Sequence, residues 1–243
     1  MLNSMQNILT GVVLHRRPYR ETSSIVDFFT REHGRLSAVC RGVHGGKSAK
    51  SQEKKSLLQP FQALQLVFSG KSDLKTLVQV DSDGRGFTLQ GNALFCALYL
   101  NELLNRLLPT DIAFPVTYDL YLASVLRLSE NQSMEAVLRE FEIHLLADLG
   151  YGFSWFEDVQ SNSEIESNRE YYFTLEQGFQ LLTNPDKSKN HFSGESVLKA
   201  ARYEWDKESL STAKRVTRMA LKPLLGDKPL KSRELFQKME QTK

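Results

Sequence analysis

The first eighty residues carry hydrophobic and polar positions in short runs of the kind that forms β-strands. Val, Ile, Phe and Thr are frequent in these runs, and such residues favour a pleated, half-buried surface. Turn residues such as Gly, Pro, Asp and Ser separate them. Closure removes exposed strand edges, so this pattern predicts a small closed barrel, either an OB-fold or an SH3-like barrel. The expected strands cover residues 11–16, 23–30, 35–40, 61–69 and 74–81.

The middle of the chain has a helical spacing instead. Residues 92–108 are apolar almost all round, which is typical of a helix buried on most sides. Pro115 suits the first turn of a helix over 115–129. A further apolar face recurs every three or four residues between Ser133, a candidate N-cap, and Gly150, a candidate helix stop.

Residues 151–192 interrupt the helices with polar, loop-like sequence. Within them, residues 170–183 fit a β-hairpin that turns near Gly178. Helical spacing resumes at 209–226 and at 231–239. We therefore expect an α+β protein, with a barrel followed by a helical domain that holds a small inserted hairpin module. The expected segments are residues 1–82, 83–150, 151–192 and 193–243.

The charge is distributed unevenly along the chain. The formal net charge of the 243 residues is only +2. Residues 1–80 nevertheless hold twelve basic against five acidic side chains, and residues 201–243 hold eleven against six. The middle of the chain is acidic. Two basic ends suggest a polyanion as partner, although the ends would also neutralise the middle across an internal interface.

The composition excludes several classes of protein. Two cysteines, Cys40 and Cys96, are too few for a disulfide framework or a four-cysteine metal site, and we expect both to be reduced thiols. No run of eighteen apolar residues occurs, and no basic segment precedes an apolar one at the N-terminus. We therefore expect a cytoplasmic protein with no membrane partner.

Residues 40–61 contain the stretch that most resembles a nucleotide-binding loop. A phosphate-binding ATPase loop needs a glycine five positions before the second glycine, here Gly46 of Gly46-Lys47-Ser48, but that position is Arg41 and Gly42 comes one residue late. We interpret the stretch as a flexible basic loop between strands, where it would grip a chain of phosphates. A merely solvated loop is the alternative. The candidate DNA-binding residues of the barrel are Arg16, Arg17, Arg20, Arg35, Arg41, Lys47, Lys50, Lys54 and Lys55.

A second basic stripe lies on the helix predicted at 209–226. Its cations recur at offsets that place them on one helix face, and they are Lys214, Arg215, Arg218 and Lys222. We count Lys214, Arg218 and Lys222 among the DNA-binding candidates. A solvated face and pairing with the acidic middle are the alternatives. Pro223 should kink or shorten this helix.

Catalytic and metal-binding patterns are sparse. Glu140, His144 and Asp148 share one helix face, but one imidazole and two carboxylates make a poor metal site. Nucleophile-elbow, HExxH and paired CxxC motifs are absent from the sequence. We expect no catalytic residue, no metal, no cofactor and no small-molecule substrate.

Several segments resemble the RecO family of bacterial DNA-repair and recombination proteins. The most specific are RRPYRETS at 16–23, LGYG at 149–152 and KPLKSREL at 228–235, and the resemblance covers nearly the whole chain. It implies an OB-fold followed by a helical domain. It also implies binding of single- and double-stranded DNA, annealing of complementary strands, and action with RecR to load RecA onto DNA coated by single-strand-binding protein. No enzymatic activity is implied.

The resemblance carries two further expectations. Many members of the family hold zinc through four cysteines after the LGYG segment, whereas residues 151–200 contain none, so packing must hold this segment together. Members also bind the acidic, apolar C-terminal tail of the single-strand-binding protein in the helical domain. The residues suited to that tail are Leu138, Arg139, Phe141 and Arg215. An ion pair of Arg139 with Glu135 or Glu142 is the alternative. The rival function is a protein-interaction adaptor whose basic barrel docks an acidic protein.

Overall fold

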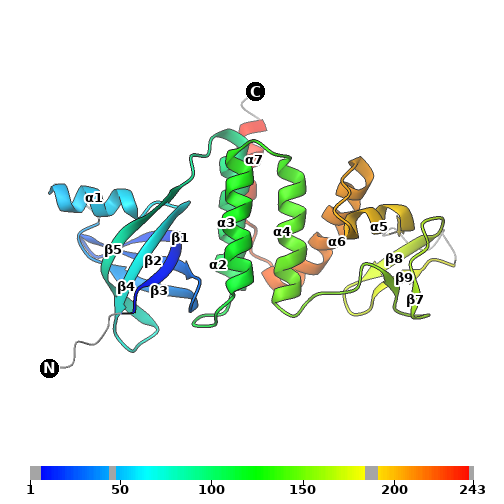
Figure 1. The fold of residues 1–243 in the computed structure, drawn as a ribbon, viewed down its shortest axis with the longest axis horizontal. Coiled ribbons are helices and arrows are strands. Elements are labelled where there is room, and N and C mark those ends of the chain that lie inside the picture. The colour runs from blue at the N-terminus through cyan, green and yellow to red at the C-terminus, as the bar shows by residue number, and fades with distance from the viewer. Residues whose placement is uncertain (1–6, 44–47, 184–190, 241–243) are drawn as a thin grey trace. The chain divides into compact units, whose positions relative to one another are not determined.

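The structure is a computed structural model, and it describes residues 7–43, 48–183 and 191–240 (Figure 1). The chain divides into two compact units. The first unit comprises residues 1–132 together with 229–243, and the second comprises residues 133–228. Within the described residues, no helix is both long enough and apolar enough to cross a membrane.

A closed five-stranded barrel of the OB type forms the core of the first unit. Around the barrel the strand order is β1-β2-β3-β5-β4, and β3 pairs with β5 in parallel while the other pairs are antiparallel. This confirms the predicted barrel and the α+β class. The strands are β1 (Leu9–Tyr19), β2 (Ser23–Thr30), β3 (Gly34–Cys40), β4 (Gln62–Ser69) and β5 (Leu74–Gly86).

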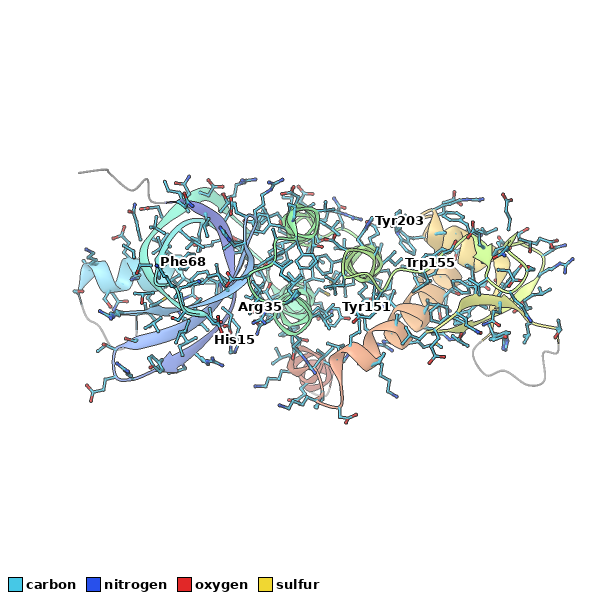
Figure 2. All side chains as sticks on the ribbon, turned by 90° about the horizontal axis from the view of Figure 1, so that it is seen from below. His15, Arg35, Phe68, Tyr151, Trp155 and Tyr203 are labelled. Carbon is cyan, nitrogen blue, oxygen red and sulfur yellow. The ribbon has the colours of Figure 1, made fainter. Side chains whose placement is uncertain are left out.

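Side chains that point to one face along each strand fill the interior of the barrel. Val26, Phe28 and Leu66 are fully buried in one core cluster. Phe68 packs against this cluster, and its ring lies inside the barrel in Figure 2. Phe28 and Phe68 meet edge to face with centroids 5.3 Å apart, a favoured geometry for aromatic pairs. Period-two sequence patterns therefore identified the core-facing positions correctly.

Helix α1 (Ala49–Leu57) replaces the flexible loop that the sequence suggested between β3 and β4. The Ser48 side chain caps it by accepting from the Ser51 backbone N–H at 3.2 Å. None of its nine residues is buried, so the segment lacks the apolar face by which helices are usually recognised. The next residue, Leu58, is fully buried in the barrel core and anchors the helix end.

Three helices complete the first unit, namely α2 (Gly91–Leu107), α3 (Pro115–Ser129) and α7 (Lys231–Glu240). Figure 1 shows α7 beside α2. The contact is specific, because the backbone N–H groups of Lys231 and Ser232 each donate to the Glu102 carboxylate at 2.9 Å. The chain thus returns to the first unit after passing through the whole second unit.

In its described residues, the second unit contains three helices and two small sheets. Strands β8, β9 and β10 form one sheet in the order β10-β8-β9, and β6 pairs with β7. The predicted hairpin is present as β8 and β9, and α6 ends two residues after Pro223. The elements are α4 (Met134–Asp148), β6 (Glu157–Asp158), β7 (Ser163–Glu164), β8 (Glu170–Thr174), β9 (Gly178–Leu181), β10 (His191–Ser193), α5 (Gly194–Ala201) and α6 (Lys207–Leu225).

The two compact units divide the chain after residues 132 and 228. Helices α2 and α3 belong with the barrel, because Asn101 bonds to β1 and Arg31 on the β2–β3 turn holds Asp119 through two hydrogen bonds of 3.0 and 2.9 Å. Helix α4 belongs with α6, to which the Lys214–Glu135 ion pair at 2.9 Å ties it. Contacts between distant residues, not local composition, decide these boundaries.

Aromatic rings hold the small sheets of the second unit together. Five rings form a continuous cluster with neighbouring centroids between 4.6 and 6.1 Å apart. They are Phe153, Trp155, Phe173, Phe179 and Phe192. In the part of the chain that the structure describes, no group of three or more His, Cys, Asp or Glu side chains is placed to hold a metal ion.

Candidate nucleic-acid interface

Three strand ends and α1 meet at one end of the barrel. The C-terminal end of β1 pairs with the start of β2, as Pro18 with Ser24, and Ser24 pairs with Cys40 at the end of β3. The Val43 N–H donates to the Thr22 carbonyl at 3.0 Å, which ties the exit of β3 to the β1–β2 turn. Segments about twenty residues apart along the chain are therefore neighbours here.

This end of the barrel gathers most of the basic residues that the sequence singled out. Arg16 and Lys54 are half-buried, and the other members are exposed. β1, the β1–β2 turn, the β3 exit and α1 each contribute, so the cations lie at one end of the barrel as one group. We call it the α1-end cluster, and its members are Arg16, Arg17, Arg20, Arg41, Lys50, Lys54 and Lys55.

Contacts inside the cluster fix two of these cations. Arg16 Nη1 donates to the Leu58 carbonyl at 3.5 Å, so this guanidinium lies over the point where α1 enters the barrel. Lys54 and Arg16 both lie close enough to the buried Cys40 thiol to act on its ionisation. Burial dominates and raises the pKa of that thiol to about 12, while the two cations work against the shift. Arg16 and Lys54 therefore approach the same strand end from different elements.

The β1–β2 turn projects a further cation. Arg20 has a positive φ of 54°, unusual for a residue with a Cβ, and it places its side chain at the tip of the turn. Its guanidinium carbon lies 5.1 Å from the centroid of the Tyr19 ring, a cation–π distance. The turn thus presents an ordered arginine beside the exposed Arg17.

A row of polar side chains crosses the outer face of the barrel next to Arg17. The buried Asp27 carboxylate accepts from the Ser37 hydroxyl and lies 3.4 Å from His15 Nδ1. Burial alone would raise the pKa of Asp27, but the hydrogen bonds from His15 and Ser37 and the charge of Arg17 lower it below its ordinary value. Asp27 is therefore a buried anion on this face, in contact with His15 and Ser37.

Two candidates of the barrel fall outside the α1-end cluster. Arg35 lies near the opposite, N-terminal end of β3, and its Nε donates to the Leu108 carbonyl at 2.9 Å. Its guanidinium therefore caps the C-terminal end of α2, and Figure 2 shows Arg35 where the barrel meets the helices. This contact gives Arg35 a structural role that does not require DNA binding. Lys47 lies outside the described residues.

The basic stripe on α6 belongs to the second unit, and two of its members already have partners there. Lys214 pairs with Glu135 at 2.9 Å, as the alternative interpretation anticipated. Arg215 lies 4.3 Å from the centroid of the Phe192 ring and donates to the His191 carbonyl at 3.2 Å. Arg218 and Lys222 are exposed. Exposure of Arg218 and Lys222 keeps both as candidates for backbone contact.

The candidate tail-binding residues differ in accessibility. Phe141 is fully buried, so it serves the core and does not line an open slot. Arg139 is 6% exposed and pairs with the buried Glu142 at 2.8 Å, which was the alternative foreseen for it. Its Nε and Nη1 nevertheless have no hydrogen-bond partner among the described residues. Leu138 is half-buried. Arg139 thus keeps unused donor groups.

The helix face of Glu140, His144 and Asp148 is occupied by the turn between α5 and α6. Trp205 Nε1 donates to Glu140 at 2.8 Å, and the Tyr203 hydroxyl lies 3.0 Å from His144 Nε2 (Figure 2). The rings of His144 and Tyr203 stack with centroids 5.7 Å apart. These contacts give Glu140 and His144 a structural role, as expected from their poor match to a metal site.

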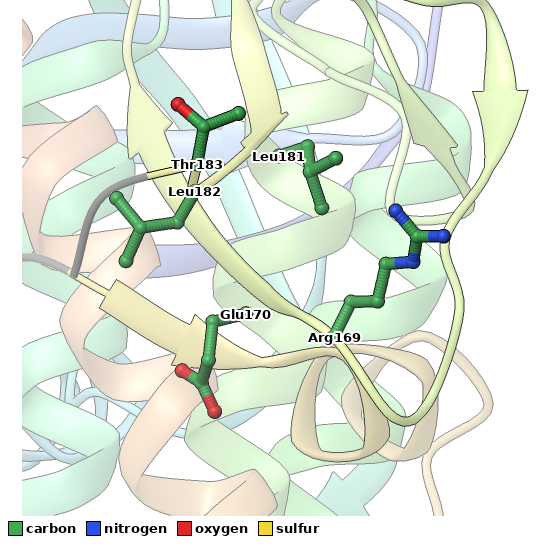
Figure 3. Close-up of a pocket in the computed structure, with 5 residues that line it drawn as sticks. All are labelled: Arg169, Glu170, Leu181, Leu182 and Thr183. Carbon is green, nitrogen blue, oxygen red and sulfur yellow. The ribbon is translucent and has the colours of Figure 1, made fainter.

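The second unit also has an open hollow of about 480 Å³ beside β8 and β9 (Figure 3). Arg169, Glu170 and Leu181 are among its lining residues. Arg169 pairs with Glu166 at 3.0 Å, and the Glu170 carbonyl accepts from the Leu182 N–H at 2.8 Å. These groups serve the local fold, so the hollow offers little for recognition.

Sequence reasoning missed how polar residues of α2 are used. Asn101 and Glu102 interrupt an otherwise apolar helix, and this was the available signal, because polar residues in a buried helix need partners. Their partners are β1 and α7, which lie far away in the sequence. Only the tertiary arrangement identifies them.

Comparison with known proteins agrees with this architecture. The model described as "Recombination protein O N terminal" matches residues 5–83, and the model described as "Recombination protein O C terminal" matches residues 89–234. The chain is similar to the "DNA repair protein RecO" of Alteromonas mediterranea, with 47% identity over 94% of this chain and 96% of the relative.

Two further relatives carry the same name. The protein of Pseudoalteromonas atlantica is 48% identical over 94% of this chain and 93% of its own length. The protein of Haemophilus influenzae is 40% identical over 93% of this chain and 94% of its own length. The similarity therefore spans both compact units.

Proposed function

Because the chain belongs to the RecO family of DNA repair and recombination proteins, we propose that it binds single- and double-stranded DNA through the α1-end cluster and anneals complementary strands. The observation that carries this proposal is the gathering of seven cations from four separate elements at one end of the barrel. Phosphate backbones release counterions to such a surface whatever their base sequence.

Annealing follows from the same surface. Two complementary strands repel each other in solution, and a shared positive surface lowers this repulsion and raises their local concentration. No group of the chain needs to form or break a bond in this process, so we expect no enzymatic activity. Lys214, Arg218 and Lys222 of α6 are additional candidates for backbone contact from the second unit.

The first experiment is fluorescence anisotropy of a labelled single strand, repeated across salt concentrations. For about five phosphate contacts, we expect log affinity to fall with log salt at a slope of roughly −3 to −4. Lys50→Glu and Lys55→Glu should each weaken binding and flatten the slope, because both side chains are exposed on a helix that buries none of its own residues.

Lys71→Glu is the matched control. Lys71 is exposed in the β4–β5 connection, outside the α1-end cluster, and this substitution makes the same charge change. We expect it to leave affinity and slope nearly unchanged. Equal losses in all three variants would point to general electrostatics instead of a defined surface. If the native protein binds no DNA at low salt, the adaptor function with an acidic protein partner takes its place.

We further propose, from the family, that the protein acts with RecR in loading RecA and binds the C-terminal tail of single-strand-binding protein. The unused donors of Arg139, with Leu138 and Arg215 on neighbouring helices, support a carboxylate-binding role in the second unit. Replacing Arg139 alone would leave Glu142 buried and unpaired. The double variant Arg139→Met/Glu142→Leu removes both charges together.

This double variant should fold and bind naked DNA like the native protein, and calorimetry should show at least a tenfold loss of affinity for a tail peptide. Arg215→Ala tests the second cation separately. If the double variant retains full tail affinity, the tail docks elsewhere and the assignment of Arg139 fails, with no consequence for the DNA surface.

A further inference from the structure

A hollow of about 320 Å³ lies within the first unit, between α2, α7 and the middle of β1. Leu98 and Leu235 supply apolar surface to it, and His15 contributes an exposed ring. Its volume lies at the lower end of the range for sites that hold small ligands. We call it the α2–α7 hollow.

One acceptor in the wall of the hollow has no donor. The Oδ1 atom of Asn105 is buried and has no hydrogen-bond partner among the described residues. One turn earlier, Asn101 uses its whole amide, because Nδ2 donates to Val13 and Leu14 and Oδ1 accepts from Tyr121. A buried acceptor without a donor is costly, so Asn105 calls for a donor on a molecule that enters the hollow.

The charged groups around the hollow are mostly positive. Glu102 is the acidic side chain found among the described lining residues. Its two oxygens accept hydrogen bonds from the N-terminal end of α7, and its Oε1 lies 3.9 Å from Arg106 Nη1. Arg106 and Lys231 are the cations among the described lining residues, so one positive charge remains beyond the pair of Arg106 with Glu102. An anion near the mouth of the hollow is therefore favoured.

The hollow is continuous with the surface that we assign to DNA. His15 pairs with Asp27 across β1 and β2, and Arg17 pairs with Ile25, so His15 and Arg17 are two residues apart and share the outer face. Arg17 belongs to the α1-end cluster. A strand held by that cluster would thus pass His15 on the way to the hollow, and this continuity favours nucleic acid over an acidic peptide as the occupant.

We propose that the α2–α7 hollow receives one unpaired base of a bound single strand, an inference that rests on the proposed DNA-binding function. The base packs against Leu98 and Leu235, and an amino or ring N–H group of the base donates to Asn105 Oδ1. Lys231, which also lines the hollow, contacts the adjoining phosphate. A paired base would have to leave its duplex first, at a cost in stacking and pairing, so the hollow favours single strands over duplexes.

The test compares a single strand carrying 2-aminopurine with the matching duplex. 2-Aminopurine fluoresces more strongly when it leaves its stacked neighbours, so the native protein should raise the signal of the single strand. Asn105→Ala should reduce single-strand affinity about threefold to tenfold, the range expected for one hydrogen bond. Duplex affinity, which depends on the α1-end cluster, should stay within about twofold.

A second variant does not depend on how Asn105 is tolerated in α2. Leu235 is 38% exposed, so Leu235→Glu adds a negative charge at the hollow without disturbing a core. Val116→Glu makes the same change at a residue that is 67% exposed in the same unit and does not line the hollow. Leu235→Glu should weaken single-strand binding at least tenfold and Val116→Glu much less.

The outcomes separate the two proposals. If the native protein binds both DNA forms but shows no 2-aminopurine response, and Asn105→Ala binds normally, the base-binding hollow is refuted while the DNA surface stands. Equal losses for single strand and duplex in Leu235→Glu would also refute it, because the charge would then act on the backbone alone. If no DNA binds at all, both proposals fail.

Discussion

Asn101 on α2 donates its side-chain amide to the Val13 carbonyl of β1 at 3.3 Å, across 88 residues of sequence. The same amide donates to Leu14 at 3.2 Å, and the Tyr121 hydroxyl donates to Asn101 Oδ1 at 2.6 Å. The register of β1 with β2 shifts between Val13 and His15, and a β-bulge of this kind leaves ladder groups unpaired. Asn101 therefore joins the helices to the barrel where the pairing of β1 with β2 is irregular, and it bonds to β1 carbonyls at that point.

Replacing Asn101 with leucine should cost about 3 kcal/mol or more in the free energy of unfolding, since buried carbonyls and a buried hydroxyl would lose their partner. Urea denaturation of the native protein and the variant measures this loss of unfolding free energy. Asn92→Leu is the matched control, because Asn92 is exposed at the start of the same helix. A loss below about 1 kcal/mol for Asn101→Leu would mean that water replaces the amide.

The barrel and most helices could be predicted from the sequence, because burial of one face of a strand or one stripe of a helix leaves a periodic pattern. The alternation of Leu64, Leu66 and Phe68 and the spacing from Met134 to Leu149 are examples. Helix α1 left no such pattern, since none of its residues is buried. Its existence depends on the Ser48 cap and on Leu58, which anchors it in the barrel.

The cations of the candidate site could be predicted from the sequence, but the way in which the fold brings them together could not. Arg17, Arg41 and Lys50 were recognisable as cations from the sequence, and the strand register then placed them at one end of the barrel. Arg35 belongs to the same list, yet its partner Leu108 is 73 residues away, so its capping role could not be read locally. Contacts at this separation are set by packing, which local patterns do not encode.

We expect packing of the aromatic cluster, and not a bound metal, to stabilise the second unit. Phe179 is fully buried and contacts four other rings of the cluster. Phe179→Ala should therefore cost about 3 to 5 kcal/mol. Phe156→Ala should change stability by no more than about 0.5 kcal/mol, because this ring is 46% exposed.

Chelation provides the complementary measurement on the same module. Thermal unfolding of the native protein should be identical with and without EDTA, because ring packing and not a metal ion is expected to hold the module. A marked fall in the unfolding temperature on chelation would contradict this and would indicate a bound metal.

Both thiols should be unreactive in the folded protein. Cys40 and Cys96 are buried, and burial raises the pKa of Cys40 to about 12, so very little thiolate exists at neutral pH. Iodoacetamide at pH 7.5 should label neither residue in the native state and both in urea, as judged by mass spectrometry. Rapid labelling of Cys40 in the native state would mean that the α1 end of the barrel opens readily.

Glu102 should make the docking of α7 depend on pH. Burial alone would raise its pKa, but hydrogen bonds from the Ser232 backbone and hydroxyl and from the Lys231 backbone lower it below the ordinary value of 4.5. A lowered pKa in the folded state means that the stabilisation is fully present above the unfolded-state pKa. It is lost as pH falls through the folded-state pKa.

The variant Glu102→Gln should therefore be less stable than the native protein at pH 7, and the difference should shrink as pH falls from about 5 to about 3. Urea denaturation at several pH values measures it. Glu234→Gln is the control on α7, because Glu234 is exposed and takes no part in the contact with α2. Its difference from the native protein should be small at every pH. A Glu102→Gln difference that stays constant with pH would show that the carboxylate charge does not hold α7, because the loss would then come from hydrogen-bond geometry that glutamine fails to reproduce.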